Sequence, residues 1–403
     1  MYKKFALLAL IVSLLPNMFS STTVQAQSEL EVLESSVEAI FPTELKFNLE
    51  AQSDTPITDV RIRYTVERSD LTEVTSEAYI DFSPETRIDV EWSWDMRKTG
   101  GLPPGTRIDY WWIVKDENGG KIETTPDRIY FEDNRHSWYD LTEEQITIYW
   151  YEGSESFSRE IMDSAQQALE QLHSNTGAEL EKPVRLYIYR NSSDLQGAMI
   201  FPQEWTGGVA FTRYSTIAIG ISPSNIDWGK RAVTHELTHL VIHQMTLNPY
   251  NNLPTWLDEG LAMHTEGVLQ PEYVAYLYRA VLEGNLISTR SLSSPFSAFT
   301  EQSYLSYAES YSIIDFLITE YGQGKMLRLL LIFKQGSSYD EALEEVYGFD
   351  MNTLNELWMK YLTAPEQSTK IIDKNKEPVF ATTLSLPVGP VNENRYASHP
   401  VQQ

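Results

Sequence analysis

Two histidines and two glutamates in the middle of the chain have the types and spacing of a zinc site. His235 and His239 stand four residues apart in a His-Glu-x-x-His pattern, with Glu236 next to the first histidine. On a helix, residues four apart project from one face, so both imidazoles can reach one tetrahedral ion. Glu236 would then stand beside a water molecule on that ion. The pattern predicts a catalytic metal centre that still needs a third ligand.

Glu259 is the best candidate for that ligand. A catalytic zinc commonly takes two histidines and one carboxylate and keeps its fourth position open. Glu259 lies in the segment from Trp256 to Glu266, whose apolar and small residues have helix-like spacing. We expect the small residues of this segment, Gly260 among them, to let it pack closely against the first helix. Two packed helices would then share one zinc ion.

The two motifs together resemble a known family. The sequence is similar to the gluzincin metallopeptidases, and specifically to the peptidase-MA-like domain, whose pattern pairs HExxH with a downstream Trp-Leu-x-Glu-Gly-x-Ala. The resemblance runs over roughly 140 to 362, about half of the chain. It implies that His235, His239 and Glu259 bind one catalytic Zn²⁺ and that Glu236 is the general base.

Further carboxylates could orient the ligand histidines. Glu266 matches the position where related enzymes place a carboxylate that holds a ligand imidazole through its second ring nitrogen. Asp258 could do the same, and the sequence does not choose between them. His243 continues the histidine series, but it lies roughly 12 Å along the helix from His235, too far to share one ion. We therefore interpret His243 as structural.

A tyrosine is expected to stabilise the oxyanion that develops during peptide hydrolysis. Gluzincins often supply one from a later helix, and the resemblance points first to Tyr307. The alternative is that Tyr304, Tyr307 and Tyr311, at offsets of three and four, form an aromatic stripe that packs one helix face. Both readings remain open at this stage.

A substrate-binding strand is readable upstream of the histidines. Gly207 and Gly208 permit close backbone approach and precede Val209 and Ala210. In gluzincins a strand near the active site pairs with extended substrate, which suggests peptide binding by β-addition along 207 to 211. A loop glycine pair before a hairpin is the plainer alternative.

Composition bounds the class of protein. The 403 residues are 42% hydrophobic and 12% aromatic, which is typical of a globular protein with sizeable cores. The net charge of −26 argues against nucleic acid or an anionic membrane as a partner. The absence of cysteine excludes disulfides, a thiol nucleophile and cysteine zinc ligands. The sequence leaves the oligomeric state open.

The first residues have the pattern of a secretion signal. Two lysines, Lys3 and Lys4, precede an apolar run from Phe5 to Leu15, and small residues ending at Ala26 form a cleavage site. An apolar run of this length is too short to span a membrane, which takes about 20 residues. We expect 1–26 to be removed after Ala26 and the mature protein to be secreted, with no membrane insertion.

The remaining chain divides into three parts. Period-two alternation of apolar residues, with turn signals between the runs, predicts an all-β sandwich of about seven strands over 27–134, immunoglobulin- or fibronectin-like. An α+β, thermolysin-like peptidase domain with a helical C-terminal half is expected over 140–362, including helices at 311–321, 325–334, 338–347 and 351–362. The proline-containing segment 363–403 has no clear period and is expected to be a flexible or surface-laid tail.

The sequence as a whole favours a secreted zinc metallopeptidase that acts on peptides or proteins. Hydrolysis would use Glu-assisted attack by zinc-bound water, as the resemblance implies. An endopeptidase is slightly favoured over an aminopeptidase, because Glu204 is the one acidic residue near the binding strand that could hold a substrate N-terminus. A catalytically silent binding or adhesion protein that keeps the peptidase fold is the alternative from another class.

Overall fold

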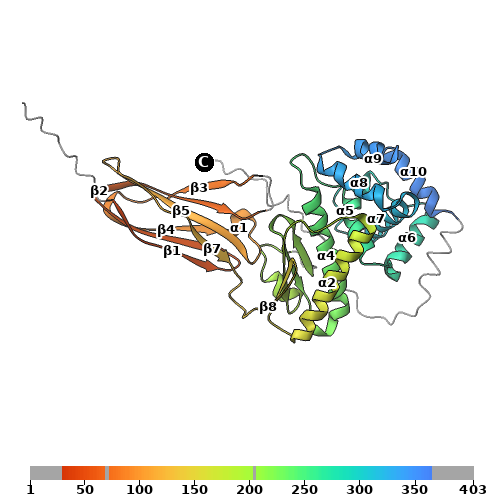
Figure 1. Cartoon of the computed structure of the whole chain (residues 1–403), viewed down its shortest axis with the longest axis horizontal. Helices are drawn as coiled ribbons and strands as arrows, with labels where there is room; N and C mark the ends of the chain where they lie inside the picture. The colour runs from red at the N-terminus through yellow and green to blue at the C-terminus, as the bar shows by residue number, and fades with distance from the viewer. Residues whose placement is uncertain (1–29, 69–71, 203–205, 365–403) are drawn as a thin grey trace, which may run out of the picture.

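The computed structural model describes residues 30–68, 72–202 and 206–364 (Figure 1). A bundle of long strands forms one end of the molecule, and a small sheet with a group of helices forms the other (Figure 1). The expected signal peptide lies outside the described residues, as do Glu204 and nearly all of the expected tail. No helix in the described ranges combines the length and the apolar character needed to cross a bilayer.

Seven strands and one short helix build the first region. They are β1 (Glu31–Ile40), β2 (Glu44–Val66), β3 (Thr75–Tyr79), β4 (Glu85–Asp95), α1 (Met96–Thr99), β5 (Thr106–Asp116), β6 (Lys121–Glu123) and β7 (Asp127–Phe131). Alternate residues of the strands point into a shared core, in which Leu45, Phe47 and Leu49 are buried. The predicted N-terminal all-β region is therefore confirmed.

The long strand β2 belongs to both layers of this region. Its residues 44–52 pair with β1 and β4, and its residues 57–66 pair with β3 and β5, with a register shift between the two halves. The two halves face each other across the core, because the ring of Phe47 lies 4.9 Å from that of Tyr110 on β5. Pro56 thus lies inside one continuous strand and does not separate two strands.

A five-stranded sheet opens the second region. It contains β8 (Tyr139–Glu143), β9 (Ile146–Trp150), β10 (Val184–Tyr189), β11 (Gly208–Phe211) and β12 (Thr216–Gly220), in the order β11-β12-β10-β9-β8. The three central strands are parallel, and the two edge strands are antiparallel to their neighbours. Side chains of one face, such as Ile148 and Ile188, pack against α2 (Glu155–Thr176) and α4 (Ile226–Thr246).

The opposite face of this sheet packs on the first region. Tyr187 and Tyr189 lie in the same core cluster as the residues of the β-rich region. The Tyr189 hydroxyl donates a hydrogen bond to Asp133 (3.0 Å), and the guanidinium of Arg185 donates one to the carbonyl of Gly105 (2.7 Å). Both faces of the three central strands and of β11 are therefore covered, whereas the other edge strand, β8, is largely exposed.

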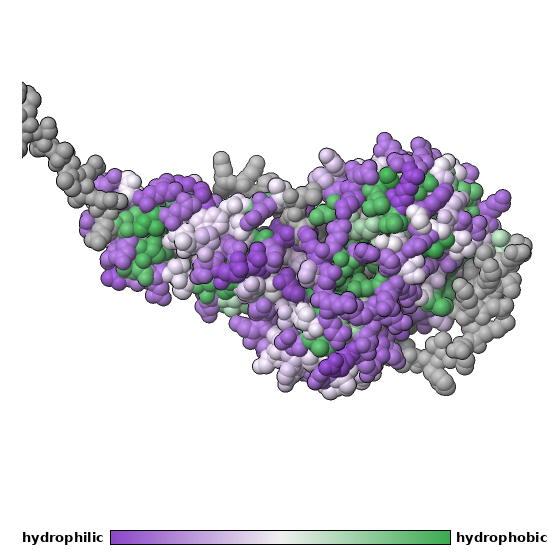
Figure 2. Space-filling model, in the orientation of Figure 1, coloured by the Kyte–Doolittle hydropathy of each residue, from purple (hydrophilic) through white to green (hydrophobic). Residues whose placement is uncertain are grey.

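Helices make up the rest of the chain, as the sequence predicts. They are α3 (Ser192–Gln196), α5 (Thr255–Thr265), α6 (Pro271–Glu283), α7 (Thr300–Tyr321), α8 (Gln323–Lys334), α9 (Tyr339–Tyr347) and α10 (Met351–Leu362), with short 3₁₀ turns η1 (Thr212–Tyr214), η2 (Pro223–Asn225) and η3 (Ser291–Ser293). Helix α7 begins eleven residues before the predicted 311–321, because packing against α5 buries its polar and tyrosine-rich first half. Hydrophilic residues cover most of the face in Figure 2.

Candidate metal centre

Helices α4 and α5 bring three potential ligand atoms together. His235 and His239 project from α4, and Glu259 projects from α5. The Nε2 atoms of both histidines lie 3.5 Å from Oε2 of Glu259. All three residues are buried, and their ligand atoms lie within 4.8 Å of one another. The predicted ligand set is therefore one cluster in space.

The chemistry of these three atoms fits a zinc ion. Each of them is buried and has no hydrogen-bond partner within the protein. Such orphaned polar atoms are costly unless another group satisfies them. Two ligand atoms about 2.1 Å from one ion lie about 3.4 Å apart at the tetrahedral angle, which agrees with the spacing to Glu259. Two imidazoles and one carboxylate are also a ligand set that zinc prefers.

Both carboxylates that the sequence left open contact a histidine, and each contacts a different one. Nδ1 of His235 lies 2.7 Å from Glu266, at the C-terminal cap of α5. Nδ1 of His239 lies 2.8 Å from Asp258. An acceptor at Nδ1 keeps the proton on that nitrogen and leaves Nε2 free to bind a metal. The second oxygen of Asp258 lies 2.9 Å from Nε2 of His243.

Asp258 is held in its charged form by the two histidines beside it. Burial raises the pKa of this carboxyl, but the charges and hydrogen bonds of His243 and His239 outweigh burial and keep its pKa well below the usual range. His243 thus stabilises a residue behind the cluster, as its structural interpretation requires.

The glycine of the second motif packs against a different helix from the one expected. A Cβ on Gly260 would lie 2.5 Å from the backbone oxygen of Ser310 and 2.6 Å from a side-chain carbon of Ile314, both on α7. The prediction that Gly260 allows close packing of α5 on α4 is therefore wrong at this residue. The glycine lets α7 approach α5 closely.

Glu236 lies between the ligand cluster and the edge strand. Its carboxyl is fully buried, and neither of its oxygens has a partner that meets normal hydrogen-bond geometry. Burial raises the pKa of Glu236 to about 7, while the nearby histidines and the backbone N–H of Ala210 oppose that rise. The amide of Ala210 on β11 is thus close enough to act on the carboxyl of Glu236.

Strand β11 presents backbone groups on the edge that faces away from β12. The N–H of Gly220 donates to the carbonyl of Gly207 (2.9 Å), so Gly207 and Gly220 form a hydrogen-bonded pair. In an antiparallel ladder such pairs alternate with pairs whose backbone groups point outwards. Gly208 and Ala210 are therefore the outward-pointing residues, and no strand among the described residues pairs with that edge.

The expected substrate strand is thus an edge strand beside Glu236 and also the first arm of a hairpin. Val209 points towards the first region, and Ala210 points towards the helices, as their core clusters show. Gly207 provides close approach of the indole of Trp228, whose carbon would lie 3.1 Å from an added Cβ. The two readings of the glycine pair, a binding edge and a hairpin start, describe the same segment.

Tyr307 lies next to the ligand cluster, while the other two tyrosines of its stripe do not. Its ring centre is 6.5 Å from that of His235. Burial, and then the charge of Glu259, raise its pKa well above the ordinary value. Tyr304 packs on Tyr273 and Tyr276 instead, and Tyr311 packs on His264. The three tyrosines of α7 therefore pack against different parts of the structure.

Tyr273 is a candidate site residue that the sequence did not indicate. It lies on α6, with its ring centre 6.5 Å from that of Tyr307. Burial raises its pKa, and the charges of Glu266 and Glu259 add to that effect, so the hydroxyl stays protonated near the ligand cluster. Nothing local in the sequence marks Tyr273, because only the packing of α6 against α7 brings it here.

The two HExxH histidines on α4 and the glutamate on α5 form an arrangement of the kind that metallopeptidases use to bind a catalytic metal. Residues 164–364 match the model of the peptidase MA superfamily. Through this domain the chain belongs to the peptidase MA superfamily. No curated protein matches the sequence.

Several solved structures are similar to the chain at low sequence identity. An M1 zinc metallopeptidase from Deinococcus radiodurans is 12% identical over 83% of this chain and 95% of that one, with a TM-score of 0.35. Aminopeptidase A from Legionella pneumophila, in complex with aspartic acid, is 12% identical over 82% of this chain, with a TM-score of 0.36. OgpA from Akkermansia muciniphila is 10% identical over 27% of this chain, with a TM-score of 0.21. The chain spans 50% of the Legionella protein and 28% of OgpA.

Proposed function

We propose that this protein is a secreted zinc-dependent metallopeptidase that hydrolyses peptide bonds in peptides or proteins. The observation that carries the proposal is the convergence of three buried, unpartnered ligand atoms, from His235, His239 and Glu259, beside the buried carboxyl of Glu236. Membership of the peptidase MA superfamily supports the same class of reaction. Secretion rests on the signal-like pattern of 1–26.

In this proposal the two histidines and Glu259 hold one zinc ion. When bound, zinc supplies a Lewis acid that polarises the substrate carbonyl and makes water a stronger acid. Glu236 takes the proton from the attacking water and gives it to the leaving amine. Its position beside both the ligand atoms and the amide of Ala210 suits a group that serves a substrate held on β11.

Neighbouring side chains set up this centre. Glu266 and Asp258 fix the ring orientation and the tautomer of the two histidines, because each accepts a hydrogen bond from the Nδ1–H of one of them. Tyr307 donates a hydrogen bond to the oxyanion that develops as water adds to the carbonyl. Support for this role is its position against His235 and its protonated hydroxyl.

Substrate binds in this proposal as an added strand. The outward backbone groups of Gly208 and Ala210 would pair with an extended peptide, while Gly207 and Val209, whose backbone groups face β12, complete the substrate-binding strand. An edge strand binds the backbone of a peptide, which is the same at every residue, so it accepts an internal segment as readily as a terminus. We therefore favour an endopeptidase over an aminopeptidase.

The test compares the mature protein, starting at Gln27, with its Glu236→Gln variant. We expect one zinc per chain in both proteins, cleavage of a peptide library by the first, and loss of cleavage in the second. Glu320→Gln, an exposed glutamate of α7, serves as the matched control and should cleave normally. Zinc binding without cleavage by any of the three proteins would favour a catalytically silent binding protein. Failure to bind zinc would reject the proposed centre.

A further inference from the structure

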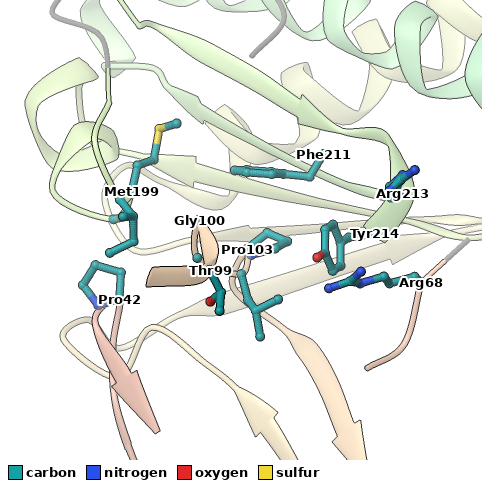
Figure 3. A pocket seen from close by; sticks show the side chains of 13 residues that line it. Pro42, Arg68, Thr99, Gly100, Pro103, Met199, Phe211, Arg213 and Tyr214 are labelled. Carbon is teal, nitrogen blue, oxygen red and sulfur yellow. The ribbon is translucent and has the colours of Figure 1, made fainter. Parts of the chain in front are cut away.

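A pocket lies where the β-rich region meets the edge of the five-stranded sheet. The β-rich region contributes the segment around α1, the turn before β2 and the residues just after β2, and the second region contributes the loop that follows α3 and the end of β11 with η1 (Figure 3). Side chains that line it include Pro42, Arg68, Thr99, Met199, Phe211 and Tyr214. The pocket is thus built by both regions and is separate from the ligand cluster on α4 and α5.

The charged side chains that line the pocket are positive. Among the described residues that line it, Arg68 and Arg213 are the charged ones, and none is Asp or Glu. The guanidinium of Arg68 lies 5.5 Å from the centre of the Tyr214 ring, and Figure 3 shows it pointing inwards beside that ring. No carboxylate in the described ranges forms an ion pair with Arg68. The chain as a whole is acidic, with 57 acidic and 31 basic residues, so a pocket with arginine side chains differs in charge from the rest of the protein.

The pocket and the ligand cluster lie on opposite faces of β11. Ala210 packs into the core on the helical side, next to Glu236, whereas Phe211 packs on the side of the β-rich region and lines the pocket. Successive residues of a strand point to opposite faces, and residues directly opposite in neighbouring strands point to the same face. An added substrate strand would keep this alternation.

The register of an added substrate strand on β11 determines which substrate residue faces the pocket. The substrate residue opposite Ala210 would point to the side of Glu236, and the next residue, opposite Phe211, would point to the pocket side. A neighbouring strand runs about 4.8 Å away, so its side chains can reach over the edge of β11. The residue that meets the pocket is therefore within about two positions of the bond that is cut.

We propose that this pocket selects substrates with an acidic side chain, Glu or Asp, close to the scissile bond, and that Arg68 recognises the carboxylate. The proposal rests on the proposed function and adds the substrate class. Arg68 provides a planar donor fork for a carboxylate, while Phe211, Met199 and Pro42 surround the aliphatic part of the side chain.

The test uses a peptide that the zinc-loaded, full mature protein cleaves. Glu, Gln and Lys are placed in turn at each of the two positions on either side of the cut, and kcat/KM is measured for every peptide. At one position we expect Glu to exceed Gln by about tenfold, a preference that weakens as salt is raised. Arg68→Gln should bring the ratio close to one by lowering kcat/KM for the Glu peptide alone.

Two further variants make the result specific. Arg68→Glu should favour the Lys peptide over the Glu peptide. Arg87→Gln, an exposed arginine of β4 that does not line the pocket, should keep the wild-type ratio. Zinc content and melting temperature show that each variant is folded.

The outcomes separate this inference from the proposed function. If the wild type cleaves peptides without a preference for Glu at any of the four positions, or keeps its preference in Arg68→Gln, the pocket does not recognise an acidic side chain and the inference is overturned. If the zinc-loaded wild type cleaves no peptide, the proposed function fails and this inference fails with it.

Discussion

Nδ1 of His235 lies 2.7 Å from the carboxylate of Glu266, on the far side of the ring from the Nε2 that faces Glu259. This arrangement makes Glu266 the acceptor that decides which nitrogen of His235 carries the proton. Glu266, which is not itself a ligand, thus keeps the Nε2 lone pair of His235 available for a metal.

Removal of Glu266 should therefore weaken metal binding without removing a ligand. We expect Glu266→Ala to lower zinc affinity by about 10- to 100-fold, as is usual when the partner of a ligand histidine is lost. Glu259→Ala, which removes a ligand itself, should lower it further. Competition with a chelator gives the affinities, and Glu272→Ala, an exposed neighbour on α6, is the control. Equal affinities in Glu266→Ala and wild type would contradict the role of Glu266.

Tyr307→Phe should impair turnover but not zinc binding. Loss of one hydrogen bond to a developing oxyanion commonly reduces kcat by about 100-fold or more. The ring itself is retained, so its contact with Phe296 and its place near His235 should persist. Steady-state kinetics and zinc analysis check this result. Tyr304→Phe, on the same helix but packed on Tyr273, should keep wild-type kcat, and an unchanged kcat in Tyr307→Phe would exclude the oxyanion role.

Gly260→Ala should destabilise the helical half. Its new methyl group would lie 2.5 Å from the backbone oxygen of Ser310, so α5 and α7 must separate. Overpacking of this kind costs about 1–3 kcal/mol. Chemical denaturation measures the loss. Gly324→Ala in α8, where an added Cβ meets nothing within 4 Å, should be neutral or slightly stabilising, and a similar effect of both substitutions would contradict the close contact.

Glu309 should make stability depend on pH. Burial raises its pKa to about 8, above the 4.5 of an exposed glutamate, although the N–H of Ile287 donates to its carboxyl. A raised folded-state pKa means that the folded protein holds the proton more tightly, so this stabilisation is complete below about pH 4.5 and is lost as the pH rises through 8. The full change is roughly 3–5 kcal/mol.

The measurement is denaturation of the wild type and of Glu309→Gln across pH 5 to 8. The neutral amide keeps an acceptor for Ile287 and has no charge to bury, so the stability of the variant relative to the wild type should rise with pH. Glu320→Gln on the exposed side of α7 should follow the wild type. Parallel curves for Glu309→Gln and wild type would show that Glu309 is ionised in the folded protein at all of these pH values.

The ligand cluster was accessible to sequence reasoning because its geometry is local. His235 and His239 share one helix face by spacing alone, and Glu259 sits in a second short motif. The sequence could not divide Asp258 and Glu266 between the two histidines. That division depends on where α5 ends relative to α4, which is set by packing and not by either motif.

Contacts between distant segments could not be predicted from the sequence for the same reason. The approach of Ala210 to Glu236 requires the strand order that puts β11 at an edge, and the position of Tyr273 requires the docking of α6 on α7. The continuity of β2 was also hidden, because Pro56 and its polar neighbours have the composition of a turn. In the structure this segment lies inside one continuous strand.

The tyrosine-bearing face of the five-stranded sheet has a practical consequence. Tyr187 and Tyr189 share a core with the β-rich region and also pack against Trp138, in the segment that joins the two regions. A truncated chain that began near residue 140 would expose these rings and the apolar side chains around them to water. An exposed apolar surface next to an unpaired strand edge favours aggregation. Recombinant production of the helical part by itself should yield aggregates, and we expect the N-terminal strands to be needed to keep that part soluble.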